Sequence, residues 1–171
     1  MRRIVIAVPI GLFLLAAFGS ELSPPSYAAC NCQPAGPGLH AAWVQRFPVH
    51  SPPGRWHRLL AYDSDRRVAV VFGGADNCPN RNGTNDTWEF DGSDWRQIAT
   101  PHSPPPRYYG GMAYDSHRQV MVLFGGWGNY YGPAYNDTWE YDGQDWHQVT
   151  PATSPAACVR FSMAYDPTRQ R

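Results

Sequence analysis

The residues best suited to contact a ligand lie in one aromatic segment, which ends at Tyr135. This segment contains Trp127, Asn129, Tyr130 and Tyr131 among glycines and a proline. Aromatic faces beside an amide can stack on a sugar ring or clamp a peptide. Large aromatic side chains are also often buried, so the same rings could instead pack on a neighbouring element. The sequence leaves both interpretations open.

Two arginines are further candidates for a ligand-binding surface. Arg55 and Arg107 are 52 positions apart, and each follows a proline-rich stretch. At the end of a loop, a guanidinium could contact a ligand directly. The simpler interpretation of each is a buried ion pair with an aspartate.

No catalytic constellation stands out in the chain. We find no recognisable Ser/His/Asp arrangement and no pair of carboxylates suited to acid–base chemistry. The six histidines fall at mostly unrelated phases of the repeat described below, and the Cys-x-Cys pair has no second cluster at metal-ligand spacing. We therefore expect no catalytic residue, no metal site and no cofactor.

Four cysteines are candidates for disulfide bonds, namely Cys30, Cys32, Cys78 and Cys158. Three pairings are open to them. Because the first two are too close in sequence to bridge each other comfortably, the favoured patterns join the N-terminal segment to Cys78 and to Cys158. Free thiols are the alternative.

The N-terminus has the three parts of a secretory signal. Arg2 and Arg3 precede an apolar run over residues 4–18, and small residues follow at Ala28 and Ala29. We therefore predict a signal peptide over residues 1–28 and a bacterial protein that is secreted, periplasmic or at the cell surface. An uncleaved anchor is the alternative, although the run is shorter than a typical membrane span.

Composition excludes some partners. The 171 residues include 14 basic and 14 acidic side chains, so the formal net charge is zero. Without a basic stripe, nucleic-acid binding has no support. No second long apolar segment follows the signal, so we expect no membrane association once the signal is removed.

A segment of about fifty residues occurs twice and begins a third time. The run Phe72-Gly73-Gly74 recurs at residues 124–126, residues 85–89 recur at 136–140, and residues 161–166 restart the pattern. A period of this size indicates a repeat architecture. The aspartates at 63, 115 and 166 recur with it, so we interpret them as scaffold residues whose side chains bond the backbone two residues on.

Each unit has the pattern of β-strands. Residues 68–72 and 120–124 are short apolar runs typical of strands covered on both faces. Residues 138–141 alternate, which places Trp139 and Tyr141 on one face. Asp-Gly pairs at 91–92 and 142–143 suit tight hairpins. We therefore predict a four-stranded antiparallel meander for each unit and no helix after the signal.

These features resemble the kelch repeat of bacterial exported proteins: an Ala-Tyr-Asp strand, a strand ending in Phe-Gly-Gly, an Asn-Asp-Thr-Trp-Glu strand, then Asp-Gly and a Trp-led strand. The resemblance implies an all-β, partial β-propeller, of the same broad class as the central domain of galactose oxidase. After a linker over 29–42, the propeller fragment spans 43–171. It comprises an outer strand over 43–49, complete four-stranded blades over 55–98 and 107–149, and a partial third blade over 158–171.

The resemblance also implies a function. Kelch proteins commonly bind partners on the rim formed by the loops between the second and third strands and the loops between blades. We therefore expect a non-catalytic binding module for a protein or a carbohydrate ligand, as a portion of a longer propeller. The alternative is a fragment of a sugar-acting enzyme of the galactose oxidase type. Open blade edges could also support self-association.

Overall fold

The described chain is entirely β-structure and loops. The computed structural model describes residues 45–76, 82–129 and 132–171, so the expected signal peptide and linker lie outside the described residues. Two compact units divide the chain, Met1–Phe47 and Pro48–Arg171, and the second contains all the strands below. The described ranges contain no helix, as expected. Within them, no helix has the length and apolar character needed to span a membrane.

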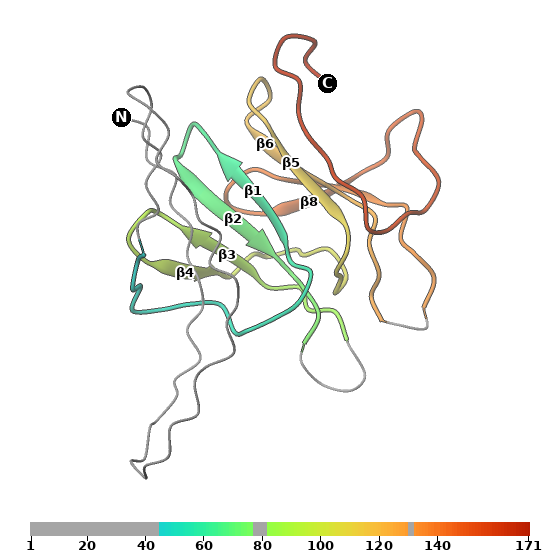
Figure 1. Ribbon diagram of the computed structural model, residues 1–171. Coiled ribbons are helices and arrows are strands. Elements are labelled where there is room, and N and C mark those ends of the chain that lie inside the picture. Colours follow the sequence, from blue (N-terminus) through green and yellow to red (C-terminus); the bar gives the residue numbers. More distant parts are fainter. Residues whose placement is uncertain (1–44, 77–81, 130–131) are drawn as a thin grey trace, which may run out of the picture. The chain divides into compact units, whose positions relative to one another are not determined.

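Eight strands form two four-stranded antiparallel sheets, which we call blade 1 and blade 2 (Figure 1). Blade 1 comprises β1 (Leu59–Asp63), β2 (Val68–Phe72), β3 (Thr87–Phe90) and β4 (Trp95–Ile98), and blade 2 comprises β5 (Gly111–Asp115), β6 (Val120–Phe124), β7 (Thr138–Tyr141) and β8 (Trp146–Val149). Strands follow chain order across each sheet. The prediction of two meanders, the blades of a partial propeller, is confirmed.

Glycines at the tight hairpins adopt the conformation that the sequence predicts. Gly92 and Gly143 have φ angles of 99° and 96°, a region that is open to glycine and strained for other residues. Beside Gly92, the Asp91 carboxylate accepts bonds from the backbone N–H groups of Ser93 and Asp94, at 2.8 and 3.0 Å. The hairpin therefore sets the pairing of Phe90 opposite Trp95.

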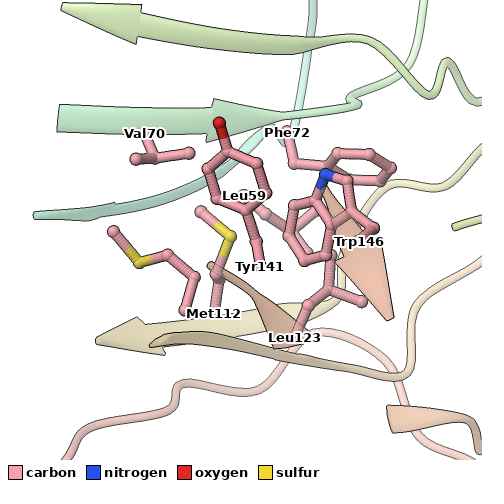
Figure 2. Packing of buried hydrophobic residues seen from close by; sticks show 8 residues of the cluster. Leu59, Val70, Phe72, Met112, Leu123, Tyr141 and Trp146 are labelled. Atoms are coloured by element: carbon pink, nitrogen blue, oxygen red, sulfur yellow. The ribbon is translucent and has the colours of Figure 1, made fainter. Parts of the chain in front are cut away.

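The core lies between the two blades, whose inner strands β1 and β5 are neighbours (Figure 1). Leu59, Val70 and Phe72 of blade 1 meet residues of blade 2 that include Leu123 and Trp146 (Figure 2). The remaining members of this buried cluster are Met112, Met121 and Tyr141. The Trp146 ring packs edge-on against Phe72 at 5.0 Å between centroids, and its Nε1–H donates to Thr87 Oγ1 at 2.9 Å. Each blade therefore completes the core of the other.

The three recurrent aspartates stabilise the turns, as predicted. Asp63, Asp115 and Asp166 each accept a bond from the backbone N–H two residues on, at 2.9 to 3.0 Å. In each copy an arginine three residues on also pairs with the aspartate: Arg66, Arg118 and Arg169. These arginines were not singled out from the sequence, although they recur with the aspartates.

The two partial blades differ from the expectation. Residues 45–49, the described part of the expected outer strand over 43–49, form no strand, and neither do residues 161–166. A strand needs a hydrogen-bonded neighbour, and none of the described strands pairs with residues 161–166. The second segment nevertheless covers blade 2, because the Phe161 ring lies edge-on to Phe124 at 6.0 Å between centroids.

Candidate functional site

The rim comprises the loops between β2 and β3 (73–86) and between β6 and β7 (125–137), together with the segment between the blades (99–110) and the equivalent segments before β1 (48–58) and after β8 (150–160). Backbone bridges join these parts: Thr84 pairs with Arg107, and Tyr108 pairs with Trp127. The two loops also bond to each other, since Gly83 N–H donates to Gly128 O at 2.8 Å. The structure thus brings both kinds of loop together.

Trp127 is half-buried and held at its backbone on both sides. It exchanges two bonds with Tyr108, at 2.8 and 2.9 Å, and it also bridges to Ala134. Its indole lies edge-on to the rings of Tyr108 and Tyr109, each at 6.3 Å between centroids. The indole therefore packs on the segment between the blades and keeps part of its surface accessible.

The other candidates in the aromatic segment differ in their surroundings. Asn129 is exposed, and its backbone oxygen accepts a bond from Gly132 N–H at 3.3 Å. Tyr130 and Tyr131 lie outside the described residues. Tyr135 stacks under a guanidinium, with Arg107 Cζ 4.4 Å from its ring centroid.

Arg55 and Arg107 form ion pairs with aspartates at equivalent positions. Arg107 is fully buried and makes two bonds of 2.7 Å to the carboxylate of Asp137. It also donates to the carbonyls of Gly125 and Pro105, at 3.0 and 3.1 Å. Arg55 pairs likewise with Asp86. Each arginine therefore forms an ion pair with an aspartate, which was the simpler interpretation. Each pair links the segment before an inner strand to the loop that follows in the same blade.

Each of these aspartates also accepts a bond from an indole. Trp88 Nε1–H donates to Asp86, and Trp139 Nε1–H donates to Asp137, both at 2.6 Å. Burial alone would raise the pKa of both carboxyl groups, but the bonds from the arginine and the tryptophan outweigh it and hold each pKa below its usual value. Both carboxyl groups are therefore ionised at neutral pH, and an Arg–Asp–Trp cluster lies at the rim in each blade.

A stack of three exposed or half-buried side chains lies along the inner edge of the rim. The His57 and Tyr109 rings stack with centroids 3.8 Å apart, and Tyr109 Oη lies 2.7 Å from His57 Nε2. The guanidinium of Arg160 lies over the same tyrosine, with Cζ 4.7 Å from the centroid. Backbone bonds run parallel to the stack, from Tyr109 N–H to His57 O and from Arg160 N–H to Tyr109 O.

The members of this stack share an unusual backbone. His57, Tyr109 and Arg160 have φ angles of 54°, 60° and 60°, in the left-handed region. That conformation costs a residue other than glycine about 1–2 kcal/mol. The three occupy the same position in successive repeats, and in the two blades this position lies two residues before the inner strand, β1 or β5. Sequence reasoning missed them, and aligning the three repeat copies is the signal that would have placed them together.

A second repeated contact joins the segments that precede each inner strand to the outer hairpins. His50 binds Asp94 and His102 binds Asp145, each through its backbone N–H at 2.8 Å and its ring Nδ1 at 2.7 Å. The histidine bond is the largest influence that lowers the pKa of Asp145, to about 2. Most histidines fall at unrelated phases, as expected, but this pair is an exception.

Two hollows in the surface lie away from the rim. One of about 440 Å³ adjoins the hairpin between β3 and β4, with Glu89 and Trp95 in its wall, and one of about 260 Å³ lies between Val122 and Tyr165. Glu89 already accepts a bond from Arg66 at 2.5 Å. The Glu89 carboxylate in the wall of the larger of these two hollows is therefore already paired.

The structure does not test the predicted disulfide bonds. Cys158 has a free, half-buried thiol, and the other three cysteines lie outside the described residues. In the part of the chain that the structure describes, no group of histidine, cysteine and carboxylate side chains could hold a metal ion.

No protein-family model matches the chain, and no curated protein matches it at a significant level.

Proposed function

We propose that this chain is an exported, non-catalytic kelch-repeat module that binds a protein or a glycan through its rim. The observation that supports the proposal most directly is the arrangement of Trp127, Tyr109 and Asn129. Aromatic surface and an exposed amide lie on loops whose backbones are bonded to one another. A rigid backbone lowers the entropy cost of ordering a binding surface.

The repeat geometry supports the kelch assignment, and the N-terminal pattern supports export. Partly buried Arg–Asp–Trp clusters recur under the rim in both blades, so the scaffold is the same while the loops above it differ. Binding proteins often place variable loops on a fixed scaffold in this way.

Array screening with the full chain, on glycan and peptide arrays, tests the proposal. We expect Trp127→Ala and Asn129→Ala to weaken capture of a bound ligand. Tyr62→Ala is the control, because Tyr62 is 57% exposed on β1, outside the rim. Unchanged affinity in Asn129→Ala together with a lowered melting temperature in Trp127→Ala would show that the rim residues are structural. Copper-dependent sugar oxidation by the full chain would favour the enzyme alternative.

A further inference from the structure

Arg160 has an exposed guanidinium that is held by aromatic rings. Its Cζ lies 4.7 Å from the ring centroid of Tyr109 and 5.6 Å from that of Trp127. No ion pair joins it to a carboxylate within the described ranges. Other arginines of the repeat do pair with carboxylates, namely Arg55, Arg66, Arg107, Arg118 and Arg169.

The position of Arg160 in the repeat separates it from the scaffold. Scaffold positions keep the same residue in each copy, as the aspartates at 63, 115 and 166 do. The position before the inner strand keeps its backbone conformation and changes its side chain, from His57 to Tyr109 to Arg160. The side chain at this position is therefore not one of the repeated scaffold residues.

The left-handed backbone at these three positions is a second feature of the stack. Glycine would adopt these φ angles without strain, yet none of the three positions has it. Strained residues of this kind cluster at functional sites, although Arg67, Gln119 and Gln170 adopt the same conformation in turns, with φ angles of 59°, 58° and 54°. Here the strain places an imidazole, a phenol and a guanidinium in one stack on the surface.

We propose that Arg160 is the carboxylate-binding residue of a subsite for acidic glycans built of uronic acid residues. The proposal rests on the proposed function and names the ligand class of the same rim. The planar guanidinium donates two parallel bonds to a carboxylate. The rings of Tyr109 and Trp127 fix its position, and Trp56, whose ring centroid lies 6.1 Å from that of His57 and which is 64% exposed, extends the aromatic row for sugar rings.

A glycan fits this surface better than an acidic peptide does. An extended peptide is commonly bound by adding a strand to an unpaired edge. At this rim the backbone groups bond to each other: Trp56 exchanges bonds of 2.8 and 2.9 Å with Ala75, and Tyr108 does the same with Trp127. Among the described residues of the stack, the groups available for recognition are flat rings and the Arg160 guanidinium, which suit a ring-shaped ligand with a carboxylate.

Calorimetric titration of the full chain with trigalacturonate tests this proposal, with galactotriose as the neutral analogue and triglutamate as the acidic peptide. We expect trigalacturonate to bind most tightly and its affinity to fall as salt rises. Arg160→Gln should weaken this binding about tenfold or more, because it removes a charged hydrogen-bonding partner, and Arg160→Lys should weaken it less. Arg96→Gln is the matched control, since the Arg96 side chain is 78% exposed on the outer strand β4.

Three results would overturn the assignment: no binding of trigalacturonate, an affinity that Arg160→Gln leaves unchanged, or tighter binding of triglutamate. None of them would by itself refute the proposed function. If another glycan or peptide binds and Asn129→Ala weakens it, the rim is still a binding surface and only its acidic-glycan specificity is wrong.

Discussion

Replacing Arg107 by methionine should destabilise the fold by about 3 kcal/mol, because it leaves a partly buried carboxylate without its cation. Breaking a buried ion pair from one side typically costs about 3–5 kcal/mol. We expect the lower end of that range, since the Asp137 side chain is 15% exposed and keeps its bond from Trp139. Methionine preserves most of the buried volume, so the loss of stability measures the contribution of the charge and its hydrogen bonds.

Urea unfolding followed by tryptophan fluorescence measures this loss, and two other arginines provide the comparison. Arg55→Met should lower the free energy of unfolding somewhat less than Arg107→Met does, because the Arg55 side chain is 13% exposed whereas that of Arg107 is fully buried. Arg118→Gln should cost about 1 kcal/mol or less, because that side chain is 48% exposed. The reasoning fails if Arg107→Met costs less than about 1 kcal/mol, or if Arg118→Gln costs as much.

The same variant should change the pH dependence of stability. Although burial opposes it, the bonds from Arg107 and Trp139 hold the pKa of Asp137 below its usual value. A carboxyl group whose pKa is lower in the folded protein adds stability above its unfolded pKa, about 3.9, and that stability is lost as the pH falls through the folded pKa. The urea midpoint of Arg107→Met should therefore fall less between pH 6 and pH 3 than that of the parent chain.

Three further substitutions test the turns and the histidine contacts. Gly92→Ala should destabilise the fold by about 1 kcal/mol, because no atom would touch the new Cβ and only the φ of 99° is unfavourable. Gln119→Gly, at a φ of 58°, should instead raise the melting temperature, and a lower value would refute the strain argument. His102→Ala should raise the pKa of Asp145 from about 2 toward the usual aspartate value, as followed by NMR titration of the carboxyl group. An unchanged pKa would show that backbone donors alone hold it low.

The strands could be predicted from the sequence because two independent copies carry the same local signals. The runs at 68–72 and 120–124 became β2 and β6 with those boundaries, and the Asp-Gly pairs became the expected hairpins. The alternation predicted that Trp139 and Tyr141 share one face, and both contact the core, Tyr141 as a buried member and Trp139 as a partly buried neighbour. Local pattern was sufficient here because a meander pairs strands that are adjacent in the chain.

The candidate site was predictable only in part. That Arg107 pairs with an aspartate was one of two interpretations, and only tertiary packing shows that it is fully buried. The stack of His57, Tyr109 and Arg160 has no composition signal, since a left-handed φ at a residue other than glycine is set by its surroundings. The expected inner strand at 161–166 is absent because strand formation depends on a neighbour as well as on propensity.

The bonds between the rim loops limit how this surface can be altered. Gly83 approaches the next loop so closely that a Cβ there would lie 2.7 Å from Arg107 N and 2.9 Å from Gly128 O. A sequence grafted into one loop would therefore push on the loop of the adjacent blade. Engineering a new specificity requires exchanging neighbouring loops as a matched set, with glycine kept where their backbones touch.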